Sequence, residues 1–208
     1  GKIAFTDSSR SLTYGELQEK SCRFAAGLKA LGLHEENRVI LLLHDTVDHP
    51  VAFWGAIRGG IVPIPVNTLL TAEQYAYLFA DSRAAAAVIA MPLLGMLLSI
   101  RPRLPHLHPI VIVDAPDGAP LPPGVHRFDD VLARAEPQQG CTPTMSDEVA
   151  FWIYTSGSTG DPKAVRHVHT TMMAASRLMG QRVIGIRQDD VVFSAAKLSF
   201  SYGLGNAM

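Results

Sequence analysis

Cysteine is scarce in this 208-residue sequence, which has only Cys22 and Cys141. The two lie far apart and form no C-x-x-C pair, so the usual spacings of zinc ribbons and redox pairs are excluded. So few cysteines fit a reducing compartment, and we expect a cytoplasmic protein. Residues 1–5 lack the charged and apolar regions of a secretory signal and lack an initiator Met, so we expect a cut end there.

An excess of either charge is also absent, because 18 Lys and Arg residues stand against 19 Asp and Glu residues. Nucleic acids and anionic lipid surfaces are bound by clustered, unbalanced basic residues, so neither is predicted as a partner. The mostly apolar residues 84–100 are too short for a membrane span of roughly 20 residues and are interrupted by Pro92 and Gly95. A buried strand at residues 85–89, followed by a helix that starts near Pro92, is expected instead.

What is present is an alternation of Val- and Ile-rich apolar runs with longer helical patterns. Hydrophobic residues make up 48% of the chain, enough to bury a sizeable core. The alternation predicts an α/β fold, with layered, flavodoxin-like βαβ units around a parallel sheet. The strands are expected at residues 39–43, 62–66, 85–89, 110–113 and 149–154.

Two capping boxes predict where helices begin. In each, a threonine and the Glu or Gln three residues later bond each other's backbone N–H groups. Thr13 with Glu16 predicts a helix that ends near Gly32, and Thr71 with Gln74 predicts a second helix.

Two further segments complete the expected organisation. Residues 50–58 read as a helix with Asp48 as a candidate cap. The six prolines between residues 113 and 149 disfavour long regular elements, so we expect a surface connection there, with a short helix at 130–135.

The segment after the strand at 149–154 carries the most chemical information. It reads T-S-G-S-T-G-D-P-K and comprises Thr155, Ser156, Gly157, Ser158, Thr159, Gly160, Asp161, Pro162 and Lys163. Its glycines let backbone N–H groups point at one spot, its hydroxyl groups add donors, and its lysine adds a compact positive charge. Such a loop suits a polyphosphate.

A flexible Gly/Ser/Thr linker is the other interpretation of this segment. It is disfavoured by position, because the segment lies between an apolar strand and a second β-like run at residues 164–168. Ligand loops commonly follow the carboxyl ends of parallel strands, and we expect that arrangement here. A Walker A loop is excluded, because only two residues separate Gly157 from Gly160 and no Ser or Thr follows Lys163.

The ordered run of nine residues resembles the phosphate loop T-S-G-S-T-G-x-P-K of the adenylate-forming superfamily, which includes the acyl-CoA ligases. Weaker features of that family stand at residues 12–17 and 59–67, and the resemblance covers essentially the whole chain. It departs at Ala164, where the family usually has glycine. A methyl group is harmless there unless φ is positive, which would cost roughly 1 kcal/mol or more, and we expect tolerance.

Residues 197–206 resemble the K-L-F-F-A-Y-G-L-G-N stretch of benzoate-CoA ligases. The resemblance implies that Phe200, Ser201, Tyr202 and Gly203 line a pocket for an aromatic acid. The alternative is that the two aromatic residues are ordinary core residues that open a helix. Ser201 replaces alanine of the family pattern, and a hydroxyl in an apolar pocket is tolerated best when it is hydrogen-bonded. Hydroxybenzoate and aminobenzoate are therefore candidate substrates together with benzoate.

His167 and His169 would share one face of a strand, which raises a metal site as an alternative. No Cys, Asp or Glu accompanies them at ligand spacing, so we assign no metal ligand to the protein. His169 matches the usual histidine of the family, and the resemblance implies that it orders a helix that starts near Thr170.

The resemblance implies an AMP-forming aryl-CoA ligase that uses ATP, Mg²⁺ and coenzyme A. In that reaction the carboxylate would attack the α-phosphorus of ATP and pyrophosphate would leave, and the CoA thiol would then take the acyl group and release AMP. Residues 155–160 would hold the phosphates, Mg²⁺ would bridge oxygens of the leaving pyrophosphate, and Lys163 is the implied catalytic residue.

The family's organisation also implies that the chain is the N-terminal portion of an AMP-binding domain. Residues 37–176 would form a better-contained subdomain, and residues 1–33 with 186–208 a second, incomplete one. The adenine- and ribose-binding motifs and the C-terminal domain would lie beyond Met208, so this piece is expected to be inactive alone. A homodimer is left open, and the competing hypothesis is a non-catalytic nucleotide- or acyl-binding module.

Overall fold

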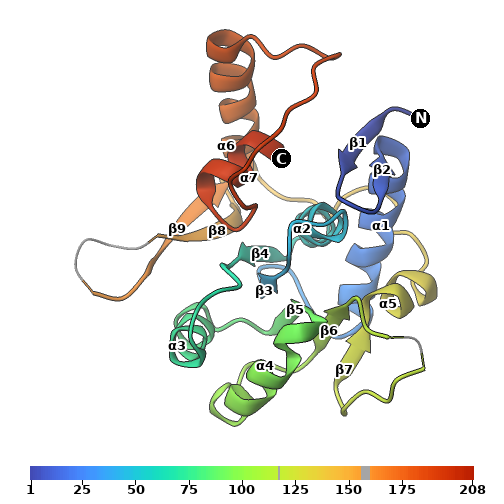
Figure 1. Ribbon diagram of the computed structural model, residues 1–208, viewed down its shortest axis with the longest axis vertical. Coiled ribbons are helices and arrows are strands. Elements are labelled where there is room, and N and C mark those ends of the chain that lie inside the picture. The colour runs from blue at the N-terminus through green and yellow to red at the C-terminus, as the bar shows by residue number, and fades with distance from the viewer. Residues whose placement is uncertain (117, 156–159) are drawn as a thin grey trace.

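The structure is a computed structural model that describes residues 1–116, 118–155 and 160–208 (Figure 1). The strands are β1 Ile3–Thr6, β2 Ser11–Thr13, β3 Arg38–Leu42, β4 Val62–Pro65, β5 Ala86–Ala90, β6 Ile110–Val113, β7 Val125–Arg127, β8 Val149–Thr155 and β9 Lys163–Val168. The α-helices are α1 Tyr14–Ala30, α2 Asp48–Arg58, α3 Ala72–Ser82, α4 Leu94–Ile100, α5 Phe128–Arg134, α6 His169–Ala175 and α7 Ser201–Ala207. Two short 3-10 turns, η1 Met91–Leu93 and η2 Arg101–Arg103, flank α4, and the π-helix η3 Ser176–Ile184 follows α6.

Five parallel strands form the main sheet, in the order β4-β3-β5-β6-β7. This confirms the predicted α/β fold with a parallel sheet. The central strands are buried on both faces, as is typical of parallel sheets covered by helices, and so read as unbroken apolar runs. None of the described helices is both long and apolar enough to cross a bilayer.

Alternate residues of each strand enter two separate apolar clusters, because side chains along a strand point to opposite faces. Val39 and Leu41 of β3 pack with α1, α2 and α5, whereas Ile40 and Leu42 pack with α3 and α4. The sheet is therefore the middle layer of three, with helices on both sides (Figure 1). Strand β8 continues the alternation, since Phe151 belongs to the first cluster.

Both predicted capping boxes are present. The Thr13 side chain accepts from the backbone N–H of Glu16, whose carboxylate accepts from the backbone N–H of Thr13, and α1 follows. Thr71 and Gln74 make the same pair of bonds at the start of α3. Gly32 takes a φ of +90° just after α1, a conformation that glycine adopts without steric cost.

One local prediction was wrong and another was incomplete. Asp48 does not cap α2, because Val47 stands at the N-cap and the Asp48 carboxylate instead pairs with the Arg10 guanidinium and accepts from the Thr46 hydroxyl. The proline-rich stretch contains the expected short helix, as α5, and in addition holds β7, which pairs with β6 at the edge of the sheet. A three-residue strand is too short to show a period in sequence, and its pairing is set by the neighbouring strand.

Strands β8 and β9 form a separate antiparallel pair beyond the β4 edge (Figure 1). The expectation of a loop at the carboxyl end of a parallel strand was therefore wrong, because the loop joins the two strands of a hairpin. The sequence of residues 149–168 does not distinguish a parallel from an antiparallel pairing. A strand gives the same apolar run whichever direction its partner takes.

Candidate functional site

The two described ends of the glycine-rich loop face each other across the hairpin. Thr155, the last residue of β8, is the register partner of Lys163, the first residue of β9, and both are exposed. The pair brings a hydroxyl and an ammonium group to the base of one loop, as the phosphate assignment requires. Ser156, Gly157, Ser158 and Thr159 lie outside the described residues, so their part of the assignment stays a prediction.

The backbone next to Lys163 accommodates both glycine and its replacement. Gly160 has a φ of +93°, a conformation that side-chain-bearing residues rarely adopt. Ala164, where the family pattern has glycine, lies within the regular extended ladder of β9 opposite Tyr154. Among the described residues, positive φ outside glycine occurs only at Glu36, Arg83 and Asp114, so the methyl group of Ala164 carries no backbone penalty.

The segment predicted to hold the acid is tied to the sheet at its start. The backbone N–H of Leu198 donates to Asp45 Oδ1 at 2.9 Å, across 153 positions of sequence. Asp45 lies in the loop that follows the carboxyl end of β3, where ligand sites of parallel sheets are commonly found. Leu204 of α7 is buried in the apolar cluster that α1, α2 and α5 form on one face of the sheet, which anchors the segment at a second point.

Phe200 and Tyr202 begin helix α7 but are not core residues. They are 48% and 73% exposed, while the buried positions around them are taken by Leu198 and Leu204. Neither side chain therefore fills the core that the described residues form. Gly203 is buried, and a Cβ there would overlap the carbonyl oxygens of Ala196 and Lys197. Glycine is required where α7 turns back on the preceding chain.

His167 is engaged in packing. Its ring stacks on Phe151 with centroids 4.5 Å apart and planes 1° from parallel, and burial lowers its pKa below the usual value. No three His, Cys, Asp or Glu side chains gather into a metal-binding group within residues 1–116, 118–155 and 160–208.

The chain thus combines a parallel sheet, an exposed Thr155–Lys163 pair and an exposed aromatic segment tied to the β3 loop. A family model for "AMP-binding enzyme" matches residues 1–208. The chain belongs to the AMP-binding enzyme family. This confirms the resemblance to adenylate-forming enzymes.

Similar proteins of this family include ligases of aromatic acids. The chain is 48% identical over its whole length to the 4-hydroxybenzoate–CoA/benzoate–CoA ligase of Rhodopseudomonas palustris, of which it covers 38%. It is 40% identical to the benzoate–CoA ligase of Thauera aromatica, again over 38% of that relative.

Among solved structures, a benzoate CoA ligase from Burkholderia xenovorans LB400 matches with a TM-score of 0.87 and 38% identity, covering 99% of this chain and 39% of that one. An anthranilate CoA ligase in complex with anthranoyl-AMP matches with a TM-score of 0.93 and 29% identity, over 99% of this chain and 39% of that one. The chain therefore spans about two fifths of the length of these relatives.

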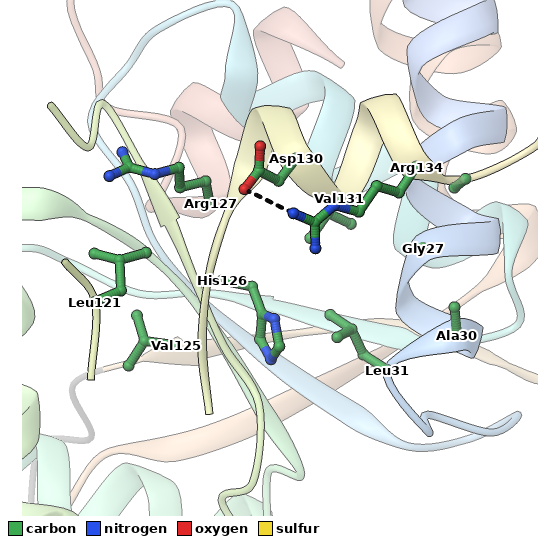
Figure 2. Close-up of a pocket in the computed structure, with 11 residues that line it drawn as sticks. Gly27, Ala30, Leu31, Leu121, Val125, His126, Arg127, Asp130, Val131 and Arg134 are labelled. Carbon is green, nitrogen blue, oxygen red and sulfur yellow. Dashed lines mark ion pairs between the residues drawn. The ribbon is translucent and has the colours of Figure 1, made fainter. Parts of the chain in front are cut away.

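One hollow of this AMP-binding family member lies away from the candidate site. It has a volume of about 230 Å³ and opens between α1, β7 and α5, where an Arg134–Asp130 ion pair of 3.6 Å crosses one side (Figure 2). Strand β7 is at the opposite edge of the sheet from β4 and the hairpin. Arg127, beside this hollow, donates to the backbone carbonyls of Ala115, Pro116 and Ala119, so its charge holds a loop.

Sequence reasoning missed three residues that touch the candidate segments from elsewhere in the chain. Asp45 binds the start of the acid segment, and Tyr77 and Asp81 of α3 bind the two sides of the hairpin. None of them belongs to a motif. Contacts across 73 to 153 positions depend on the fold, and a single sequence carries no local signal for them.

Proposed function

We propose that the protein activates benzoate or a hydroxy- or aminobenzoate with ATP and transfers the acyl group from the adenylate to coenzyme A. The observation that carries this proposal is the full-length match to the AMP-binding family together with 48% identity to a 4-hydroxybenzoate–CoA/benzoate–CoA ligase. The exposed Phe200 and Tyr202 support the aromatic substrate, since their rings are free to stack on or meet the edge of a bound ring.

In this proposal Lys163 stabilises the negative charge of the triphosphate and of the departing pyrophosphate. Its ammonium group is exposed at the base of the loop and faces Thr155 across the hairpin, so both can reach one anion. Preorganised donors of this kind stabilise charge without rearranging during the reaction. Residues 156–160 would add backbone N–H donors, and Phe200, Ser201, Tyr202 and Gly203 would line the acid pocket.

Mg²⁺ and coenzyme A belong to the same proposal. Magnesium in nucleotide sites is usually held through substrate phosphates with few protein carboxylates, so we propose that the ion arrives bound to ATP. When bound, the ion would offset phosphate charge. We place the protein in the cytoplasm, where ATP and reduced CoA are available.

We also propose that these 208 residues are the N-terminal portion of the enzyme, with further domain structure outside them. The chain covers 38% of its curated relatives, and large apolar side chains stay open after β9, among them Val183 at 70% and Phe193 at 90% exposure. A shared subdomain of residues 1–33 and 186–208 is supported by a contact from Lys2 Nζ to the backbone oxygen of Gln188.

The test is a panel of acids offered to the full-length protein with ATP, Mg²⁺ and CoA, with AMP and acyl-CoA measured by chromatography. We expect aryl-CoA and AMP in equal amounts from benzoate or a substituted benzoate. Fatty acids, acetate and amino acids serve as the competing classes. If any of them exceeds every aromatic acid in kcat/KM by about tenfold, or about 1.4 kcal/mol, the substrate proposal is wrong. Binding of ATP without turnover of any acid would indicate a non-catalytic module.

A further inference from the structure

Helix α3 is hydrogen-bonded to both sides of the β8–β9 hairpin. Asp81 Oδ2 accepts a hydrogen bond of 2.5 Å from the Tyr154 hydroxyl, and the Tyr77 hydroxyl donates to the backbone oxygen of Pro162 at 3.2 Å. Tyr77 and Asp81 are four residues apart, so they lie on one face of the helix, one turn from each other. We call these two bonds the α3 clasp.

The clasp acts next to the residues assigned to phosphate. Tyr154 immediately precedes Thr155 on β8, and Pro162 immediately precedes Lys163 on β9. Thr155 and Lys163 are register partners, and α3 binds the residue that precedes each of them. One helix face therefore restrains both members of the pair. A shift of either strand end would move the hydroxyl and the ammonium group relative to each other.

Helix α3 is a firm support for such a restraint. Its opposite face places Tyr75, Leu78 and Phe79 in the apolar cluster beneath the sheet, each no more than 2% exposed. The buried Tyr75 hydroxyl also donates to the backbone oxygen of Asn67 at 2.9 Å, which fixes the start of the helix. Buried side chains in a close-packed interior transmit displacement with little loss.

The two hydroxyl groups of the clasp are held in the donating form. Burial raises the pKa of Tyr154 above its usual value, and its hydrogen bond to Asp81 raises the pKa further. Burial and the nearby Asp81 charge raise the pKa of Tyr77 in the same direction. Both phenols therefore keep their protons across the neutral and mildly alkaline range in which adenylation would be measured.

We propose that Tyr77 and Asp81 are positioning residues for nucleotide binding, which hold Thr155 and Lys163 in the relative placement that a polyphosphate requires. The inference rests on the proposed function, because it assigns a role to the support of the same site. Neither residue touches substrate in this proposal. Their effect reaches ATP through Tyr154 and Pro162.

The first test uses Tyr77→Phe and Asp81→Ala in the full-length protein, with ATP–pyrophosphate exchange as the readout. Each change removes one bond of the clasp, and we expect the KM for ATP to rise about five- to tenfold, with the KM for the aromatic acid within about twofold. Asp81→Asn keeps an oxygen that accepts from Tyr154 and should restore the KM for ATP to within about twofold of the starting protein. Tyr14→Phe and Asp129→Ala are the matched controls, since both residues are exposed and lie on α1 and α5.

A second measurement separates the clasp from catalysis. Amide hydrogen exchange should become faster in peptides that contain Tyr154 and Lys163 in both clasp variants, with no change in peptides from β3 and β5. Unchanged exchange in the hairpin peptides would overturn the clasp itself. Faster exchange with equal rises in the KM values for ATP and for the acid would show a general structural role and overturn the nucleotide assignment.

The same experiment distinguishes failure of the clasp from failure of the proposed function. If the starting protein binds no ATP and catalyses no pyrophosphate exchange with any of the acids, the proposed function is refuted. The nucleotide role of the clasp is then refuted with it, whatever the hydrogen exchange shows. A starting protein that exchanges pyrophosphate, with variants whose KM for ATP is unchanged, would leave the proposed function standing and refute the clasp alone.

Discussion

Two regions of this chain bury their apolar side chains to very different extents. In the parallel sheet, Val39, Leu41, Val88 and Val111 have no exposed surface, and inward-facing helix side chains such as Phe24 and Leu97 are equally buried. From Lys163 onward, the buried side chains among the described residues are those of Leu198, Ser199 and Leu204. Val191 and Phe193 are 95% and 90% exposed in the same region.

The difference separates residues that packing within this chain explains from residues that it does not. Val and Ile in the strands are accounted for by the two apolar clusters they fill. The exposed aromatic and hydroxyl groups near α7 fill neither cluster, so packing among the described residues does not account for their identity. Contiguous exposed apolar side chains mark interaction or ligand surfaces in soluble proteins.

The comparison predicts the largest effect for Phe53, which is fully buried in α2 and meets Phe151 edge-on at 5.4 Å. Phe53→Ala should lower the free energy of unfolding by about 3 to 5 kcal/mol, through lost transfer energy and an unfilled cavity. Phe193→Ala is the matched change in the other region and should stay within about 0.5 kcal/mol. Urea unfolding of the 208-residue chain, in which these exposed fractions hold, measures both by circular dichroism. Equal effects would remove the distinction between the regions.

The next largest effect concerns His49, which is fully buried at the start of α2. Both of its ring nitrogens lack a hydrogen-bond partner among the described residues, and burial lowers its pKa from 6.5 to about 4. Because the folded pKa is below the unfolded one, the fold favours the neutral ring. The stabilisation is complete above about pH 6.5 and is lost as pH falls toward 4, with a total of about 3 kcal/mol.

His49→Leu should therefore flatten the pH dependence of the unfolding free energy between about pH 6.5 and 4. His106→Gln is the control, because His106 is exposed and should leave the slope unchanged. Urea unfolding at several pH values gives the slope for each variant. A slope that survives His49→Leu would assign the acid sensitivity to other groups.

How far the sequence predicts this structure follows the same division. In the sheet, the Val- and Ile-rich runs placed β3, β5 and β6 to within one residue, because a short apolar run between two helical patterns indicates a buried strand. The capping boxes at Thr13 and Thr71 were found for a similar reason, since both partners of each bond are three residues apart.

What the sequence did not predict depends on contacts between distant segments. The antiparallel pairing of β8 and β9, the edge strand β7 and the pairing of Asp48 with Arg10 all require knowledge of which elements meet. At the candidate site, Lys163 and Phe200 could be chosen through a family resemblance. Tyr77, Asp81 and Asp45 could not, because a tyrosine or an aspartate on a surface is usually a solvated residue.

Lys163 tests whether the hairpin serves the nucleotide. Lys163→Ala in the full-length protein should slow adenylation by roughly ten- to a hundredfold, since a hydrogen bond to a charged group is worth about 1.5 to 3 kcal/mol. Thioester formation from supplied acyl-adenylate should change much less, because pyrophosphate has already left. Arg166→Ala removes an exposed cation from the opposite face of β9 and should leave both steps within about twofold. Both steps falling equally in folded Lys163→Ala protein would mean that Lys163 supports structure or the later step.

The smallest expected effect is at Ser201, the exposed first residue of α7. If its hydroxyl faces a ring substituent, Ser201→Ala should shift kcat/KM from hydroxy- or aminobenzoate toward benzoate by roughly 1 to 2 kcal/mol, as for one hydrogen bond. The free energy of unfolding should stay within about 0.5 kcal/mol, because an exposed serine contributes little to packing. Ser99→Ala, an exposed serine of α4 on the other side of the sheet, is the control. Relative kcat/KM values that do not move with Ser201→Ala would place its hydroxyl away from the substrate, and the exposed segment would then discriminate between acids through Phe200 and Tyr202 alone.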